Sequence, residues 1–283
     1  MQTDNKNRQF NDPEDLLNFA KYLCEINRFI LSDYWDNFIK TVVETSHKRA
    51  KIIEKGVTLV RARIGTKWVT FDDGDEQPCP ISPLDMGPPS KDKAIEGRIN
   101  PKGIPYLYLS TNKETAIAEV RPWIGADATL GYFKILEDLK VIDTSTDKQK
   151  ICSKYAIYLN SEEMRPITYS NAEKEECIWG DINAAFSQPI SPNDSTLKYL
   201  STQYLSEIIK TNGYDGIAYK SSVSEKGHNI CLFYPDKAKC IGCNMFKINK
   251  VKYEFEQSGN PVTLSEDNRV FHTRITNLRP IDE

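Results

Sequence analysis

Residues 96 to 122, with the sequence EGRINPKGIPYLYLSTNKETAIAEVRP, combine three side chains that could bind and transform a charged ligand. Arg98 follows a glycine in a turn, Tyr108 ends an apolar run, and Glu119 lies within a short helical pattern. Arginine can bind phosphate groups bidentately, and a carboxylate can stabilise positive charge that develops in a transition state. This order of side chains favours a pocket for a charged ligand over a buried scaffold.

Two further groups of polar residues could belong to the same site. Arg61 and Arg63 are two positions apart on a predicted strand, so they share one face of it. Ser221 and Ser222 directly follow the apolar run YDGIAYK, which is also a predicted strand. Taken one at a time, these residues are explained better as ordinary surface arginines and turn serines. It is their combination that indicates a site.

The motifs of several other chemistries are missing from the sequence. Its three histidines form no His-Glu-x-x-His pattern, and there is neither a Gly-x-x-x-x-Gly-Lys-Ser/Thr loop nor a Gly-x-Ser-x-Gly motif. Cys240 and Cys243 form a Cys-x-x-Cys pair, but a zinc site needs two more ligands at suitable spacing, and none follows. We therefore expect a site without a metal.

The composition is that of an ordinary globular protein. The chain has 283 residues, of which 39% are hydrophobic and 27% charged, and this length allows one large domain or two small ones. A net charge of -3 provides no overall basic field, which argues against a nucleic-acid partner. We find no apolar run long enough for a transmembrane helix and no signal peptide in the polar start MQTDNKNRQFNDPEDLL. Because the seven cysteines are irregularly spaced, we expect free thiols and a cytoplasmic location.

Sequence patterns place these residues in an α+β body. Apolar spacing predicts helices over residues 12–31, 33–53, 112–120, 173–186 and 195–212. Strands are predicted at 57–65, 104–110, 130–136, 140–145, 214–221 and 229–235, and the alternation over 238–257 indicates an edge strand or hairpin. Residues 66–95 contain several prolines and are predicted to be a long loop. The elements lack the regular alternation of a doubly wound fold.

Taken together, the motifs resemble the RES domain, a family named after its arginine, glutamate and serine. The resemblance is carried, in order along the chain, by RAR (61–63), GPP (87–89), GRINPKGIPYLYLS (97–110), ETAIAEVRP (114–122), YDGIAYKSS (214–222) and NICLF (229–233). It extends from about residue 57 to about residue 236, with little to match between residues 143 and 195.

The resemblance implies a fold like that of ADP-ribosyltransferases of the diphtheria-toxin type. We expect an α+β fold whose mixed β-sheet core has flanking helices and is preceded by a small helical module. The expected segments are a helical N-terminal module over residues 1–55, a RES domain over 56–258 and a C-terminal extension over 259–283. The first segment resembles the extra segment of longer RES proteins.

The resemblance also implies an activity, which is the consumption of NAD by cleavage of the nicotinamide–ribose bond in a toxin or defence effector. NAD would be the substrate, with no further cofactor. The acceptor would be water in a glycohydrolase, phosphate in a phosphorylase, or a side chain of a cellular protein in a mono-ADP-ribosyltransferase. A non-enzymatic module that senses nucleotide is a further alternative. The implied partners are a cognate antitoxin, which would cover the cleft, and a second copy of the chain in a homodimer.

The family's site residues carry over to individual positions of this sequence. The resemblance implies phosphate contacts from Arg61 and Arg98, a ring contact to nicotinamide or ribose from Tyr108, stabilisation of the ribose cation by Glu119, and a hydrogen bond to ribose or the nicotinamide amide from Ser221.

At some positions the sequence departs from the family pattern or leaves its alignment open. Ser222 is an alternative alignment for the family serine, Lys220 stands where the family often has proline, and Val60 stands where an aromatic residue often precedes the first arginine. Transferases with protein acceptors often carry a second glutamate two positions before the catalytic one. Because that position is Ile117 here, the sequence favours breakdown of free NAD.

Overall fold

The computed structural model describes residues 8–145, 168–188, 199–224, 226–255, 257, 259–264 and 269–272 of the chain. The chain divides into two compact units, Met1–Ile248 and Asn249–Glu283. The second unit contains an antiparallel hairpin of β11 (Val262–Leu264) and β12 (Val270–His272). The first unit contains the main sheet and the helices.

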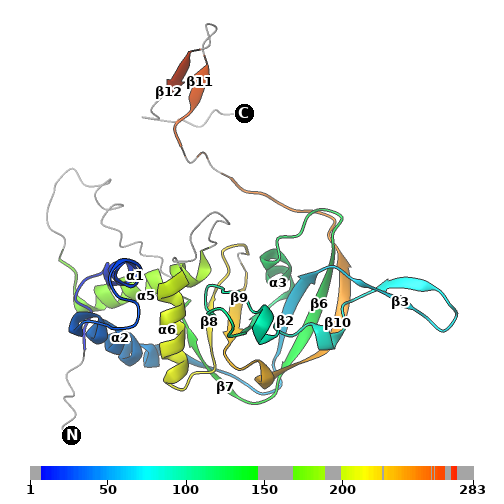
Figure 1. Cartoon of the computed structure of the whole chain (residues 1–283), viewed down its shortest axis with the longest axis horizontal. Helices are drawn as coiled ribbons and strands as arrows, with labels where there is room; N and C mark the ends of the chain where they lie inside the picture. Colours follow the sequence, from blue (N-terminus) through cyan, green and yellow to red (C-terminus); the bar gives the residue numbers. More distant parts are fainter. Residues whose placement is uncertain are drawn as a thin grey trace. The chain divides into compact units, whose positions relative to one another are not determined.

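Among the described residues, the first unit is built on an eight-stranded mixed sheet in the order β1-β7-β8-β9-β5-β2-β6-β10 (Figure 1). β7 and β8 run parallel, and the other neighbouring strands run antiparallel. In sheet order, the strands are β1 (Ala50–Ile53), β7 (Leu139–Asp143), β8 (Gly216–Lys220), β9 (His228–Leu232), β5 (Leu107–Ser110), β2 (Thr58–Ile64), β6 (Asp127–Ile135) and β10 (Ala238–Lys247). The predicted mixed sheet of an α+β fold is confirmed.

The sheet is apolar on both faces, and alternation along the strands places neighbouring side chains in different hydrophobic clusters. On β8, Ile217 and Tyr219 belong to a cluster with the helices, whereas Ala218 between them belongs to a cluster on the opposite face. On β9, Cys231 faces the helices and Ile230 faces away. This is the period of two that a pleated strand imposes.

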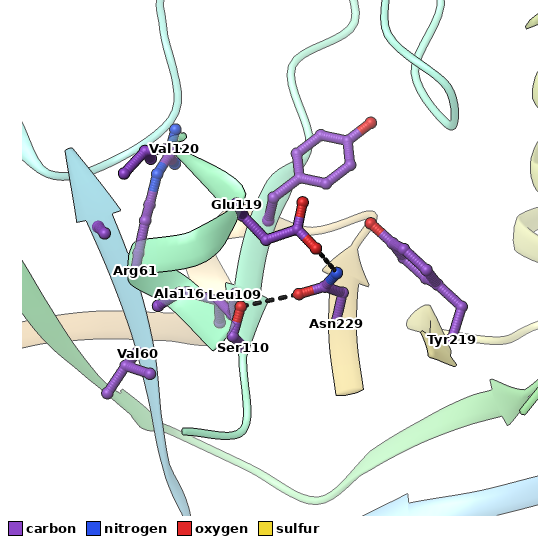
Figure 2. Close-up of a pocket in the computed structure, with 11 residues that line it drawn as sticks. Val60, Arg61, Leu109, Ser110, Ala116, Glu119, Val120, Tyr219 and Asn229 are labelled. Carbon is purple, nitrogen blue, oxygen red and sulfur yellow. Dashed lines mark hydrogen bonds between the residues drawn. The ribbon is translucent and has the colours of Figure 1, made fainter. Parts of the chain in front are cut away.

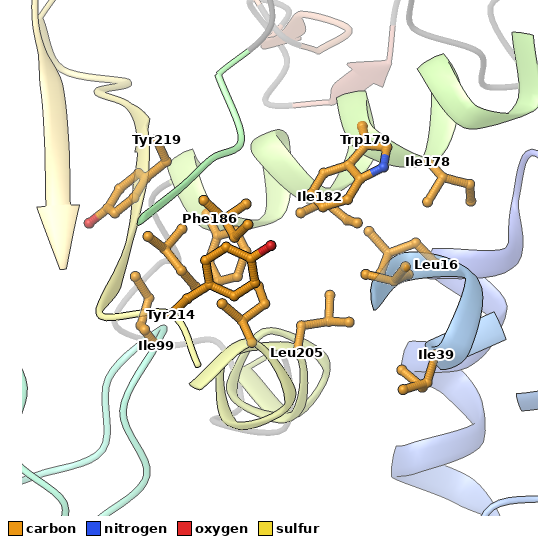
Figure 3. Packing of buried hydrophobic residues seen from close by; sticks show 14 of the residues in the cluster. Leu16, Ile39, Ile99, Ile178, Trp179, Ile182, Phe186, Leu205, Tyr214 and Tyr219 are labelled. Carbon is orange, nitrogen blue, oxygen red and sulfur yellow. The ribbon is translucent and has the colours of Figure 1, made fainter. Parts of the chain in front are cut away.

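Helices cover one face of the sheet, and the N-terminal helices are part of this layer. Leu16 of α1 (Asp15–Glu25) and Ile39 of α2 (Asp33–Ser46) lie in the same cluster as Trp179 of α5 (Asn171–Ser187) and Leu205 of α6 (Leu200–Thr211) (Figure 3). The indole Nε1 of Trp179 donates a hydrogen bond of 3.1 Å to Thr45 Oγ1 of α2. The predicted helical N-terminal segment is present.

The predicted boundary at residue 55 does not coincide with a boundary in the packing. α1 contacts both α5 and α6, and β1 pairs with β7 at the edge of the main sheet. The N-terminal helices therefore share one core with the region that resembles the RES domain. The division of the chain into three functional segments stays a prediction.

Several elements differ from those predicted. The second helix ends at Ser46, and the last part of its predicted range forms the short helix η1 (His47–Arg49) and β1. The predicted long loop contains a hairpin of β3 (Lys67–Thr70) and β4 (Glu76–Cys79) and the short helices η2 (Pro83–Asp85) and η3 (Lys91–Lys93). Of the two alternatives predicted over 238–257, the edge strand is present as β10, which ends at Lys247 and is preceded by η5 (Pro235–Lys237). Residues 195–198 of the predicted fifth helix lie outside the described residues.

The cysteines agree only in part with the expectation of free thiols. Cys24, Cys79, Cys231, Cys240 and Cys243 are not disulfide-bonded. Cys177, at the buried face of α5, is disulfide-bonded, which corrects the expectation at this position. Within the described ranges, each helix is too short or too polar to cross a bilayer.

Candidate functional site

A cleft lies where α3 (Lys113–Glu119) crosses the strands in the middle of the sheet. It consists of two cavities of about 180 Å³ and about 380 Å³, and Arg61, Tyr108, Glu119 and Tyr219 line both of them. The smaller cavity, drawn in Figure 2, also has Ser110 and Asn229 on its wall. The larger one continues past other polar and aromatic side chains, namely Glu96, Arg98, Asn100, Tyr106 and Tyr199. Together they fall within the size range of small-molecule sites, about 300–1,000 Å³.

The loop between β8 and β9 fixes the beginning of α3. Asn112 caps the helix, because its Oδ1 accepts a hydrogen bond of 2.8 Å from the backbone nitrogen of Thr115. The Nδ2 of Asn112 donates to the carbonyl oxygen of Lys226, and Thr115 Oγ1 donates to Ser224 Oγ at 3.0 Å. A Cβ atom on Gly227 would lie 2.0 Å from Thr115 Oγ1, so only glycine allows this close approach.

The carboxylate of Glu119, at the end of α3, is held by a chain of hydrogen bonds. Its Oε1 accepts from Ser221 Oγ at 2.8 Å and from Asn229 Nδ2 at 2.5 Å. Asn229 Oδ1 in turn accepts from Ser110 Oγ at 2.8 Å (Figure 2). Within the described residues, Oε2 makes no hydrogen bond. One carboxylate oxygen is therefore fixed by the protein, and the other can face a ligand.

Arg61 brings a buried cation to the junction of the two cavities. β2 and β5 are joined at the pair Val60–Ser110, and Arg61 is the next residue of β2. Its Nη1 is buried and has no hydrogen-bond partner in the described part of the chain. Burial, followed by the charge of Arg63, lowers the pKa of Arg61 to about 10. An unpaired buried cation is costly, and an anionic ligand would compensate it.

Arg63, the other arginine of the pair, has a different position. Its Nη2 donates a hydrogen bond of 2.6 Å to the carbonyl oxygen of Gly87. This bond ties β2 to the GPP segment at residues 87–89, whose last proline lines the larger cavity. Arg63 therefore supports the wall of the cleft, whereas Arg61 contributes to its interior.

Arg98 reaches the larger cavity from a turn that α6 holds in place. Thr202 Oγ1 donates to the carbonyl oxygen of Arg98 at 2.6 Å, and Gln203 Nε2 donates to that of Gly97 at 2.8 Å. The guanidinium donates through Nη1 to the carbonyl oxygen of Phe186, at the end of α5. Its Nε is buried and has no partner among the described residues. Arg98 therefore has a donor left for a ligand.

Tyr108 connects this turn to the sheet. Its hydroxyl donates to Asn100 Oδ1 at 2.8 Å and accepts from the backbone nitrogen of Ile99 at 3.3 Å. Burial is the main cause that raises the pKa of Tyr108 well above its usual value. A Cβ atom on Gly97 would lie 2.6 Å from Asn100 Oδ1 and 3.2 Å from the Tyr108 hydroxyl. The hydroxyl is thus used by the protein, and the ring remains as part of the cavity wall.

The structure brings most of the predicted site residues together. Arg61, Tyr108 and Glu119 line both cavities, Arg98 lines the larger one, and Ser221 contacts Glu119 from outside the cavity walls. Of the two alternative serines, it is Ser221 that makes the hydrogen bond with the glutamate. The roles of these residues toward a ligand stay predictions.

Sequence reasoning did not identify Asn229, Ser110 and Tyr219. Asn229 is the first residue of the NICLF motif, and it lies opposite Ser110 of β5 and Tyr219 of β8 in the strand register. The three side chains lie side by side because their residues are paired across neighbouring strands and point to the same face of the sheet. Strand pairing was needed to see this, although the presence of a polar residue in each of three apolar strands was a signal.

Comparison with known families identifies the chain. A model of the RES domain matches residues 77–244, which is more than half of the sequence. The chain belongs to the RES domain family. The matched range includes Arg98, Tyr108, Glu119 and Ser221 of this RES protein and begins after Arg61.

One solved structure that resembles this RES protein is titled as the crystal structure of the M. tuberculosis MbcT–MbcA toxin–antitoxin complex. The two chains are 13% identical, the alignment covers 73% of this chain and 92% of the other, and the TM-score is 0.38. No curated protein matches the sequence.

Proposed function

We propose that this RES protein consumes NAD by cleaving the bond between nicotinamide and ribose. The observation that carries the proposal is the donor set of the cleft. Two buried arginine nitrogens, Arg61 Nη1 and Arg98 Nε, lack partners in the described part of the chain, and they line a cleft whose wall also presents Glu119. NAD combines a negatively charged pyrophosphate with a ribose that becomes positively charged during cleavage, so it matches both kinds of group.

The two cavities suggest how the dinucleotide would lie. Arg61 lines both cavities, so a pyrophosphate near their junction would be within reach of Arg61 and, on the larger side, of Arg98. The nicotinamide riboside would then occupy the side where Glu119 is held by Asn229, and the adenylate the larger side with Tyr106 and Tyr199. Both arginines would bind the substrate before and during cleavage.

The chemistry is the replacement of nicotinamide at the ribose carbon. As the carbon–nitrogen bond breaks, its electron pair goes to the nicotinamide ring, which leaves as a neutral molecule. The ribose gains oxocarbenium character, which the free oxygen of Glu119 would stabilise. A water oxygen then bonds to the carbon and releases a proton to solvent, giving ADP-ribose, or phosphate attacks instead and gives ADP-ribose 1″-phosphate.

Water and phosphate are the acceptors that we favour. A transferase with a protein acceptor often has a glutamate two positions before the catalytic one, and this chain has Ile117 there. Mono-ADP-ribosyl transfer to a cellular protein is the alternative within the same chemistry. A non-enzymatic nucleotide sensor would bind NAD in the same cleft and leave it intact.

The biological role is proposed from the family. NAD consumption would make the chain a toxin or defence effector, and a cognate antitoxin would prevent damage by covering the cleft. A homodimer and a cytoplasmic location complete the proposal.

The experiment is a time course of NAD with the purified full-length chain, with and without phosphate, followed by mass spectrometry. We expect nicotinamide to appear together with ADP-ribose, or with ADP-ribose 1″-phosphate when phosphate is present. Radiolabelled NAD chased into protein would reveal the transferase alternative. If NAD binds but remains intact at high enzyme concentration, the proposed enzyme is wrong and the nucleotide sensor takes its place.

A further inference from the structure

Two cysteines on the edge strand β10 are in direct contact. Cys240 Sγ and Cys243 Sγ lie 3.8 Å apart, and both residues are free and half-buried. The sequence motif that they form has no role in the proposed cleavage of NAD. Their contact is therefore a feature of the fold that needs its own explanation.

A β-bulge causes the contact. Residues three apart on a regular strand point to opposite faces. On β10, however, Cys240 lies opposite Phe133 of β6 and Gly242 lies opposite the next residue, Tyr132, so Ile241 is left without a counterpart. This one extra residue changes the alternation and places both cysteines on the same face.

The surroundings keep the two sulfur atoms side by side. Both cysteines pack against the hydrophobic cluster that contains Met86 on the face away from the helices. A Cβ atom on Gly131, which pairs with Cys243, would lie 3.2 Å from Cys240 Sγ, so the sulfur occupies the space that this glycine leaves open. A disulfide requires a sulfur–sulfur distance of about 2.05 Å, and the sulfur atoms would need to approach by less than about 2 Å.

We propose that Cys240 and Cys243 form a site of reversible dithiol–disulfide exchange, with a small-molecule disulfide of the glutathione type as the oxidant. One cysteine sulfur attacks the oxidant, forms a mixed disulfide and releases one reduced thiol. The other cysteine sulfur then attacks the mixed disulfide at the protein sulfur, closes the Cys240–Cys243 bond and releases the second reduced thiol. The protons of the protein thiols pass to the leaving thiolates, and one oxidant is reduced for each bond formed.

The reduced pair is stable until such an oxidant is supplied. Burial, together with the hydrogen bond to Cys240, raises the pKa of the Cys243 thiol to about 12. The thiol of Cys243 is therefore protonated at neutral pH, and because the thiolate is the reacting form, both its spontaneous oxidation and its exchange with the oxidant are slow, so the redox state of the pair is compared after equilibration.

The test is a redox titration of the purified full-length chain in mixtures of reduced and oxidised glutathione. Remaining thiols are alkylated in acid, the chain is digested, and the cysteine peptides are quantified by mass spectrometry. We expect the peptide that contains both cysteines to lose two hydrogen atoms, and to be oxidised about tenfold more than Cys79, the matched free and half-buried cysteine of β4. Equal oxidation of all free cysteines, or stable glutathione adducts on the pair, would overturn the proposal.

Two controls separate an effect of the fold from simple closeness in sequence. In a Cys240→Ser variant, Cys243 should end as a glutathione adduct or remain a thiol, and a Cys79→Ser variant should form the disulfide as the parent does. Unfolded in urea, the parent should form the bond about tenfold less readily at the same glutathione ratio. If the unfolded chain forms it equally well, the bulge does not create the site. NAD cleavage does not enter this test, so its outcome is independent of the proposed function.

Discussion

Replacing Arg61 by methionine should stabilise the empty protein and weaken its binding of a dinucleotide. Methionine keeps the length and apolar character of the side chain and removes its charge. The Nη1 of Arg61 is buried and has no partner in the described residues. An arginine that serves the fold would give the opposite change in stability, so the sign of the effect separates the two roles.

The structure gives the size of the expected change in stability. Burial and the charge of Arg63 lower the pKa of Arg61 to about 10, well below the ordinary value of an arginine. At about 1.36 kcal/mol per pKa unit, holding the charge in the folded protein costs about 3 kcal/mol. Because the folded-state pKa is the lower one, this cost is fully present below about pH 10. After allowance for imperfect packing of methionine, we expect the free energy of unfolding to rise by about 1–3 kcal/mol.

Ligand binding should change in the other direction. A hydrogen bond between a charged donor and a charged acceptor contributes about 1.5–3 kcal/mol. Its loss should raise the Kd for ADP-ribose, which avoids turnover, by a factor of about 10 to 150. Calorimetric titration gives this constant, and urea unfolding without ligand gives the stability.

Arg63→Met, two residues along the same strand, is the matched control. It removes the hydrogen bond to Gly87, so the free energy of unfolding should fall by about 1–2 kcal/mol. Its effect on the Kd for ADP-ribose should be smaller than that of Arg61→Met. A ligand-binding role of Arg61 is refuted if Arg61→Met destabilises the empty protein and leaves the Kd unchanged.

Three other variants test the cleft and the core. Asn229→Ala removes a donor to Glu119, so kcat for NAD cleavage should fall by a factor of about 10 to 100 with little change in KM. If kcat/KM falls equally but only because KM rises, Asn229 serves substrate binding instead. Gly97→Ala places a Cβ atom 2.6 Å from Asn100 Oδ1, so urea unfolding should show a loss of about 1–3 kcal/mol; unchanged stability would mean that the turn moves freely. Burial raises the pKa of Asp181 to about 6, so its ionisation lowers stability above that pH, and the cost disappears as the pH falls below it. Asp181→Asn should therefore raise the melting temperature at about pH 8 and leave it unchanged at about pH 4; a gain that is independent of pH would exclude this cause.

The sequence predicted those parts of the fold that depend on interactions between residues close together in the chain. The strands β8 and β9 and the helix α3 were readable because side-chain periodicity depends on near neighbours. β1 was predicted as the end of a helix, because Ala50–Ile53 is too short and too apolar to show its period. Its pairing with β7, far away in the sequence, is what makes it a strand. Long-range pairing of this kind has no signature in a single sequence.

In the candidate site, too, residue types could be predicted from the sequence, whereas long-range contacts could not. Arg61, Arg98 and Glu119 were found from residue type, order and family resemblance, without any knowledge of distances. The difference between Arg61 and Arg63 could not be predicted, because it depends on whether a carbonyl oxygen from residue 87 is within reach. Asn229 was missed for a related reason, since its contact with Glu119 crosses 110 positions of the chain.

The most direct test of the central claim compares the parent chain with Glu119→Gln in the NAD time course. Glutamine keeps the shape and can still bond to Ser221 and to Asn229 after an amide reorientation, but it removes the negative charge. We expect both proteins to bind ADP-ribose, and we expect nicotinamide release by the variant to be slower by a factor of about 100 to 1,000. If the variant releases nicotinamide as fast as the parent, Glu119 does not stabilise the ribose cation and the proposed cleavage site is wrong.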